Sequence, residues 1–156
     1  MRKVKTMNVI ICIDENQGML FNNRRQSKDI KVIEDIASLA KELWISPFSE
    51  KLFIDENVKT NLVIQVRDNA IIHADEGSYC FVENEKLMPY QDKIEQLIIY
   101  KWNRSYPSDF KLDLNLNEWK LIETIDFAGN SHEKITREIY KGQKGSTTNV
   151  GVWGRA

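Results

Sequence analysis

Apolar residues fall into short runs separated by segments rich in Asp, Asn and Gly, a pattern typical of strands bounded by turns. The run over residues 9–13, Val-Ile-Ile-Cys-Ile, is continuous and too short for a helix, so it predicts a central strand covered on both faces. Further strands are expected over residues 43–46, 61–66, 78–82 and 97–100. The apolar patch over residues 70–73 fits either a strand or a helix.

Helical periodicity is clearest after the first strand. Apolar residues recur at spacings of three and four from Ile30 to Ala40, with charged residues between them. This predicts an amphipathic helix over residues 28–41, with Ser27 as its N-cap. Shorter helices are expected from about residue 49 and within residues 85–96.

The order of these elements predicts the fold class. Strands and helices alternate through most of the chain, which favours an α/β fold with a mainly parallel sheet and helices on both faces. Residues 119–125 and 135–140 have no helix between them and predict a closing antiparallel strand pair. We expect a single domain over residues 1–141 and a flexible tail over residues 142–156, which is rich in Gly, Ser and Thr.

Composition narrows the function classes. The 156 residues include 22 Lys and Arg and 23 Asp and Glu, so the net charge of −1 does not favour a nucleic-acid partner or an acidic membrane surface. No run approaches the roughly 20 apolar residues of a membrane span. The two cysteines, Cys12 and Cys80, lie in apolar runs, as expected of free, buried thiols in the cytoplasm.

Four stretches together resemble dihydrofolate reductase. They are the first strand with the loop carrying Asp14, Gly18, Phe21 and Asn22, then residues 41–53, 79–100 and 119–140. The last is the most specific, because a strand that begins with Trp, a polar loop containing Asn130-Ser131-His132 and a final alternating strand occur in that family in the same order. The resemblance implies a three-layer fold with a mainly parallel central sheet.

The resemblance also implies a catalytic carboxylate. In that family the loop after the first strand closes over the nicotinamide, and a carboxylate in the following helix binds the pteridine ring. Asp29 is the nearest carboxylate here and could hold a protonated heterocycle through charge-assisted hydrogen bonds. The alternative is that Asp29 only stabilises the first helical turn through the helix dipole.

The stretches that bind the dinucleotide cofactor in that family differ here from the family pattern. Glu83 and Asn84 stand where the family has a pair of glycines that let the backbone approach the dinucleotide pyrophosphate. A carboxylate about 4 Å from a phosphate would be opposed by several kcal/mol. Pro47 and Glu50 likewise remove a backbone donor and add negative charge in the second phosphate-binding stretch. These are degenerate NADPH-binding motifs, so we assign no cofactor-binding residues and expect no cofactor.

The loop after the first strand remains the candidate ligand site. Its proposed ligand-binding residues are Asp14, Gly18, Phe21, Asn22, Arg24, Arg25 and Ser27. The two arginines lie near the positive end of a helix and could grip a carboxylate or a phosphate. Alternatively, they pair with Asp14, Glu15 or Asp29.

Other chemistries find no support in the sequence. His73 and His132 have no cysteine or carboxylate at zinc-ligand spacing, so we expect no metal site and no metal-dependent nuclease. The chain has no Gly-x-Ser-x-Gly motif, and neither cysteine has a base near it in sequence, which leaves acyl transfer unsupported.

Two function hypotheses follow. The first is a protein with the dihydrofolate reductase fold and a lost or altered dinucleotide site, acting as a module that binds a small molecule, an anion among the candidates, or a protein partner such as a second copy. The second is an NADPH-dependent reductase of a pteridine-like substrate with an atypical cofactor site.

Overall fold

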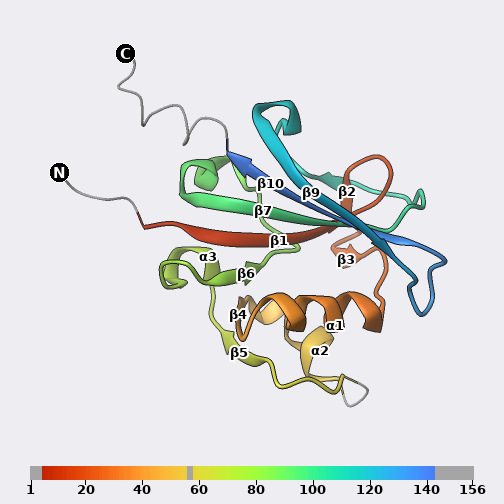
Figure 1. Cartoon of the computed structure of the whole chain (residues 1–156), viewed down its shortest axis with the longest axis horizontal. Coiled ribbons are helices and arrows are strands. Elements are labelled where there is room, and N and C mark those ends of the chain that lie inside the picture. The colour runs from red at the N-terminus through yellow and green to blue at the C-terminus, as the bar shows by residue number, and fades with distance from the viewer. Residues whose placement is uncertain (1–4, 56–57, 143–156) are drawn as a thin grey trace.

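A seven-stranded sheet runs through the computed structural model, which describes residues 5–55 and 58–142. Its strands lie in the spatial order β5 (Val63–Val66), β4 (Glu42–Ile45), β6 (Tyr79–Phe81), β1 (Met7–Ile13), β7 (Ile94–Lys101), β10 (Ile135–Gly142) and β9 (Trp119–Phe127) (Figure 1). The strands from β5 to β7 pair in parallel, whereas β10 pairs antiparallel with both β7 and β9. The predicted parallel sheet with a closing antiparallel pair is confirmed.

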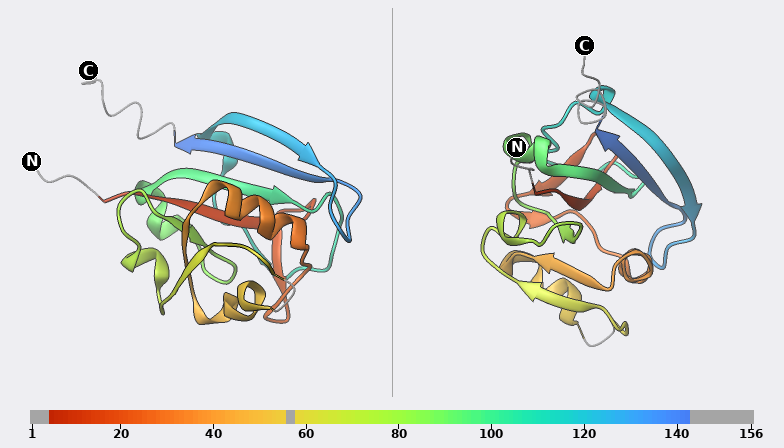
Figure 2. Two further views of the ribbon diagram at one scale, coloured as in Figure 1. Left: turned by 60° about the horizontal axis from the view of Figure 1, so that its bottom comes forward. Right: turned by 60° about the vertical axis from the view of Figure 1, so that its left-hand side comes forward.

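Helices cover both faces of this sheet. The helices α1 (Ile30–Leu39) and α2 (Glu50–Ile54) pack on one face, and α3 (Ala70–His73) packs on the other (Figure 2). Side chains of β1 alternate between the faces: Ile10 joins the α1 side of the core, whereas Val9 and Ile11 join the opposite side. All three are fully buried, as the apolar run predicts for a central strand.

A smaller sheet follows β1. It consists of β3 (Arg24–Arg25), β2 (Gly18–Phe21) and β8 (Phe110–Lys111) in that order. Asn22 and Asn23, both with positive φ angles of 52° and 60°, form the turn between β2 and β3. A two-residue turn with two positive φ angles matches the twist of a hairpin, and Asn tolerates that conformation well. This hairpin brings Arg25 and the residues after it back toward the main sheet.

Two local expectations differ from the structure. Residues 85–96 form no regular helix but the 3₁₀ segment η2 (Met88–Lys93), and β7 already begins at Ile94. Pro89 has no backbone donor, and the Asp113 carboxylate accepts the N–H groups of Leu87 and Met88 from outside the segment. The 3₁₀ segments η1 (Pro47–Ser49) and η3 (Leu116–Glu118) complete the chain's regular elements within the described ranges.

The cap of α1 is the second difference. The helix begins at Ile30 and its N-cap is Asp29, whose Oδ1 accepts the backbone N–H of Lys31. The predicted cap, Ser27, lies two residues earlier.

No helix in the described part of the chain is long and apolar enough to cross a membrane. The tail predicted over residues 142–156 lies, apart from residue 142, outside the described residues.

Candidate functional site

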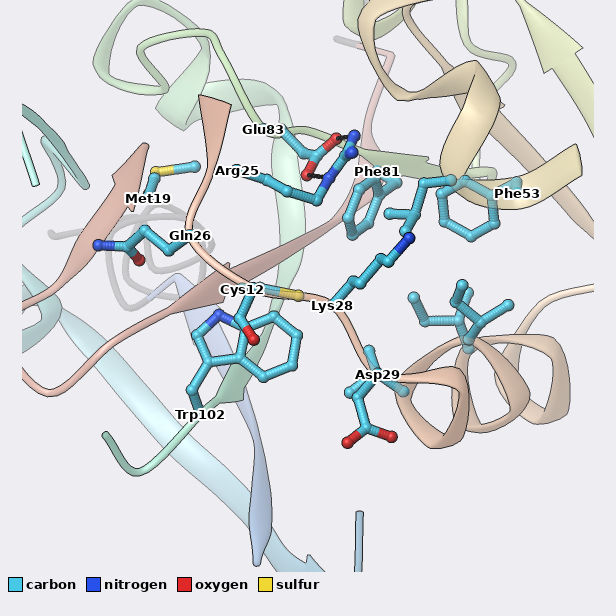
Figure 3. A pocket seen from close by; sticks show the side chains of 15 residues that line it. Cys12, Met19, Arg25, Gln26, Lys28, Asp29, Phe53, Phe81, Glu83 and Trp102 are labelled. Atoms are coloured by element: carbon cyan, nitrogen blue, oxygen red, sulfur yellow. Dashed lines mark hydrogen bonds and ion pairs between the residues drawn. The ribbon is translucent and has the colours of Figure 1, made fainter. Parts of the chain in front are cut away.

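A pocket lies on the α1 side of the sheet, beside the carboxyl ends of β1, β6 and β7 (Figure 3). Its apolar lining comes from Cys12, Met19, Val32, Ile33, Ile36, Leu52, Phe53, Phe81 and Trp102, and its polar lining from residues 25–29 and Glu83. The pocket is partly open to solvent, and its volume is about 20 Å³, little more than one water molecule needs. Open α/β sheets place their ligands at such strand ends, so this pocket is the candidate site.

One wall of the pocket is an ion pair made within the chain. Arg25 Nε and Nη2 donate to the two carboxylate oxygens of Glu83 over 2.8 and 2.7 Å, a bidentate arrangement visible in Figure 3. Ser49 is fully buried and donates its hydroxyl to Glu83 Oε1 over 2.7 Å. The hydrogen bonds with Glu83 raise the pKa of Arg25 further above its ordinary value. The Glu83 carboxylate is therefore held by two partners at the end of β6.

The Arg25–Glu83 ion pair concerns the hypothesis that the two neighbouring arginines bind an anionic ligand. Arg25 also lies over the Phe48 ring, 5.7 Å from its centroid, so its guanidinium is engaged on several sides. Its partner is Glu83, which is none of the three carboxylates that the sequence offered. Arg24 is exposed, and no described residue forms an ion pair with it. The two arginines thus have different environments.

Asp29 lies where α1 meets the loop between β9 and β10. Its carboxylate accepts the backbone N–H groups of Asn130 and Ser131 over 2.8 to 2.9 Å, in addition to the N–H of Lys31. His132 Nδ1 lies 2.9 Å from Asp29 Oδ2. Both side chains are almost entirely buried, at 0% exposure for Asp29 and 2% for His132. In Figure 3 the Asp29 carboxylate points away from the Arg25–Glu83 pair.

These contacts set the ionisation of Asp29. Burial alone would raise its pKa, but the hydrogen bonds from Asn130, His132, Lys31 and Ser131 outweigh that effect and lower the pKa to about 2. Asp29 is therefore a carboxylate at neutral pH and can only accept hydrogen bonds. His132 must then carry its proton on Nδ1, which leaves Nε2 as the acceptor in the neutral ring.

Two hydroxyl groups meet the other side of the His132 ring. Ser27 Oγ lies 2.9 Å from His132 Nε2, and Tyr106 Oη lies 3.2 Å from the same nitrogen. The Tyr106 hydroxyl also reaches Ser27 Oγ at 3.4 Å. Trp102 stacks on the imidazole with a centroid distance of 4.7 Å and fixes its plane. The result is a continuous hydrogen-bonded chain from Ser27 through His132 to Asp29.

Asp14 stabilises the loop after β1 and does not line the pocket. Its carboxylate accepts the backbone N–H groups of Asn16, Gly18 and Tyr106 and the side-chain amide of Gln26. Burial opposes ionisation, but these hydrogen bonds outweigh it and lower the pKa of Asp14 below its ordinary value. Gly18 allows close packing there, because a Cβ would lie 2.6 Å from Ser108 Cβ.

The predicted site residues divide between the pocket and its surroundings. The residues that line the pocket are Arg25, Ser27 and Asp29, and those that do not are Asp14, Gly18, Phe21, Asn22 and Arg24. Phe21 is 41% exposed at the end of β2. Asn84 follows Glu83 and is partly exposed. The structure therefore places only residues from the second half of the predicted loop, from Arg25 onward, at the pocket.

His132, Trp102 and Cys12 belong to the site and were missed as functional residues. The only sequence signal for His132 was its place in the Asn130-Ser131-His132 loop, which had been used to support the fold. Cys12 faces the pocket, and burial together with the nearby Glu83 raises the pKa of its thiol well above the ordinary value, so the thiol is neutral. Among the described residues, no cluster of His, Cys, Asp and Glu could hold a metal ion.

Comparison with known proteins identifies the fold but not a family. The chain matches no family model and no curated protein. It is similar to dihydrofolate reductase from Enterococcus faecalis, solved in complex with NADP(H) and RAB-propyl, with a TM-score of 0.62 and 8% sequence identity. The match covers 88% of this chain and 96% of that structure. The α/β fold predicted from the resemblance, that of dihydrofolate reductase, is confirmed.

Proposed function

We propose that this protein binds a small molecule through an apolar group in the pocket beneath α1, and that it does not use NADPH in the ordinary way. The observation that carries this proposal is the Glu83 carboxylate, held by Arg25 and Ser49 at the end of β6. The resemblance places the glycines that approach a dinucleotide at residues 83 and 84. Here the Glu83 side chain, bound by Arg25 and Ser49, takes that place, so a pyrophosphate would meet a side chain instead of open backbone N–H groups.

The environment of Asp29 supports the same proposal. A carboxylate that orients a pteridine ring needs oxygen lone pairs free for the ring's N–H groups. Asp29 instead accepts hydrogen bonds from Lys31, Asn130, Ser131 and His132. A heterocycle would have to displace contacts made within the protein, at a cost to its affinity.

The lining and size of the pocket indicate what kind of group it takes. The space of about 20 Å³ is partly open to solvent, and its apolar lining includes Val32, Ile36, Phe53 and Phe81. The space holds a methyl group without rearrangement, and the opening to solvent leaves the rest of a short chain outside it, whereas a bicyclic ring would require α1 or its neighbours to move. The apolar lining favours an uncharged group.

The alternative is an NADPH-dependent reductase with an altered cofactor site. The likeness to a dihydrofolate reductase solved with NADP(H) favours it. A thermal-shift titration with NADPH separates the two, because a cofactor at 100 times its dissociation constant stabilises a protein by about 2.7 kcal/mol. We expect no shift with NADPH or dihydrofolate. A saturable shift with NADPH would overturn this part of the proposal.

The pocket itself is tested with 1-butanol, whose methyl end can enter the space while its hydroxyl stays in the opening to solvent. We expect saturable changes in the NMR methyl signals of Val32 and Ile36, which line the pocket. The variant Val32→Phe should fill the space and abolish the changes. Ile122→Phe, at an exposed position of β9, is the matched control and should leave them intact. Butanol-dependent changes that do not saturate, or that are absent, would contradict a ligand pocket here.

A further inference from the structure

The hydrogen-bonded chain of Ser27, His132 and Asp29 is not needed to explain a simple binding pocket. Ser27 and Asp29 flank Lys28 in the segment before α1, and His132 comes from the loop between β9 and β10. The two outer distances, Ser27 Oγ to His132 Nε2 and His132 Nδ1 to Asp29 Oδ2, are both 2.9 Å. A hydroxyl, an imidazole and a carboxylate in this order form the arrangement that activates a serine nucleophile on unrelated folds.

Proton positions in the chain are consistent with that role. Asp29 can only accept, so the Nδ1 proton of His132 points at it and Nε2 is free to accept the Ser27 proton. The Tyr106 hydroxyl lies 3.2 Å from Nε2 and 3.4 Å from Ser27 Oγ, and it donates to the Ser27 oxygen when Ser27 donates to Nε2. The hydroxyl protons of Tyr106 and Ser27 and the Nδ1 proton of His132 then each form one hydrogen bond. The imidazole is held in place from two sides, by Asp29 and by the stacked Trp102 ring.

Ser27 also lines the pocket, so a group bound there lies next to the hydroxyl. Two donors are candidates to stabilise negative charge on a substrate carbonyl: the Tyr106 hydroxyl, 3.4 Å from Ser27 Oγ, and the backbone N–H of Lys28, the next residue in the chain. No residue in the described part of the chain accepts a hydrogen bond from that N–H. A backbone N–H directly after the nucleophile is a common member of an oxyanion hole.

We propose that the protein hydrolyses small esters, with Ser27 as the nucleophile, His132 as the general base and acid, and Asp29 as the residue that positions His132. Because the acyl group would occupy the apolar pocket, the substrate class is an ester of a short acyl chain such as acetyl. The inference rests on the proposed function to the extent that both use this pocket.

The reaction uses only the ester and water. Ser27 Oγ bonds to the carbonyl carbon while its proton passes to His132 Nε2; the bond to the leaving alcohol then breaks, and the alcohol takes that proton. Water attacks the acyl-serine and gives a proton to His132. The bond to Ser27 Oγ breaks, His132 returns the proton to Ser27, and the carboxylic acid leaves.

Diisopropyl fluorophosphate, which labels activated serines, provides the direct test. We expect one adduct on the wild-type protein, mapped by peptide mass spectrometry to Ser27, and hydrolysis of p-nitrophenyl acetate. Ser27→Ala should remove both, and His132→Gln should lower the hydrolysis rate by about 100-fold or more. Ser38→Ala, at an exposed position on α1, is the matched serine control and should behave like the wild type.

Asp29 requires a separate readout because it also supports the fold. In Asp29→Asn that remains folded by circular dichroism, we expect kcat for p-nitrophenyl acetate to fall while KM stays unchanged, since the amide no longer fixes the His132 tautomer. An unchanged kcat in this folded variant would remove Asp29 from the mechanism.

Failure of this proposal is distinguishable from failure of the proposed function. Saturable butanol binding without a Ser27 adduct would overturn the ester chemistry and leave the binding pocket standing. An adduct at Ser27 without butanol binding would support the nucleophile and overturn the pocket. Labelling that maps to any other serine of the wild-type protein would contradict the assignment, and this outcome depends on no variant being folded.

Discussion

Asp29 Oδ2 lies 2.9 Å from His132 Nδ1, and this buried contact joins the start of α1 to the loop between β9 and β10. The same carboxylate accepts the backbone N–H groups of Asn130 and Ser131. Residues about one hundred positions apart in the chain are thus held by one charged group. Such a group makes the stability of the fold depend on pH.

We predict that the free energy of unfolding falls as Asp29 is protonated. The pKa of Asp29 is lowered from 3.8 to about 2 in the folded protein, so the ionised form stabilises the fold above pH 3.8 and this contribution is lost as the pH falls toward 2. The expected loss is on the order of 1 to 2 kcal/mol once solvent screening is allowed for. Urea unfolding across this pH range measures it.

Asp29→Asn is the control for this pH dependence. The variant cannot titrate at position 29, so its stability should be lower than that of the wild type at neutral pH, and the difference between the two should shrink below pH 3.8. Asp14 also has a lowered pKa and contributes equally to both proteins. A difference that stays constant down to pH 2 would contradict the assignment to Asp29.

We predict different consequences for the two neighbouring arginines. Arg25→Ala leaves the mostly buried Glu83 carboxylate without its bidentate partner and should cost about 1 to 3 kcal/mol of stability. Arg24→Ala is the matched control, and since Arg24 is exposed it should change stability by no more than about 0.5 kcal/mol. Thermal and urea denaturation measure both. Equal losses would mean that the Arg25–Glu83 pair contributes no more than an ordinary surface charge.

The sequence predicted the sheet better than it predicted the site, for a physical reason. The apolar run at residues 9–13 and the alternating pattern at residues 135–140 report burial of neighbouring positions, which a local sequence carries directly. Segment 85–96 has an apolar spacing compatible with a helix, but contacts from Asp113 and the proline at position 89 override it. Such distant contacts do not show in a local pattern.

The site depends on contacts that only the strand order creates. Arg25 and Glu83 are separated by 58 positions, and Ser27 and His132 by 105. Because β1 lies between β6 and β7, the segments that follow these strands meet at one edge of the sheet, and the loop with His132 reaches the same edge because β10 runs antiparallel to β7. Sequence reasoning placed Arg25 and Ser27 in a ligand loop. It found acyl transfer unsupported because it looked for a Gly-x-Ser-x-Gly motif and for a base near each cysteine in sequence, and neither criterion detects residues that only the fold brings together.

We predict a large loss of stability for Ile11→Ala. Ile11 is fully buried in β1, which pairs with β6 on one side and β7 on the other, so truncation leaves a cavity that the sheet cannot close. The expected cost is about 2 to 5 kcal/mol in urea unfolding. Ile122→Ala, 45% exposed on β9, is the matched control and should cost less than about 1 kcal/mol. A similar cost at both positions would show that β1 is not the centre of the core.

We predict that Gly129→Ala disturbs the Asp29–His132 contact. A Cβ at position 129 would lie 2.7 Å from Asp29 Oδ2 and 2.7 Å from the His132 backbone oxygen, and Asp29 Oδ2 cannot move without disturbing its hydrogen bonds with Asn130, Ser131 and His132. The expected cost is about 1 to 3 kcal/mol, seen as a lower midpoint in thermal unfolding. Labelling of Ser27 by diisopropyl fluorophosphate should fall with it.

Gly142→Ala is the control for the added methyl group at position 129. Its Cβ would lie 3.6 Å from the Trp119 ring, an ordinary contact, so the variant should be as stable as the wild type or slightly more stable, because an alanine loses less backbone entropy than a glycine on folding. A wild-type midpoint for Gly129→Ala would mean that the loop between β9 and β10 can shift away from α1. In that case the hydrogen bonds at Asp29 would not fix the position of His132, either as a contact between α1 and this loop or as the proposed general base.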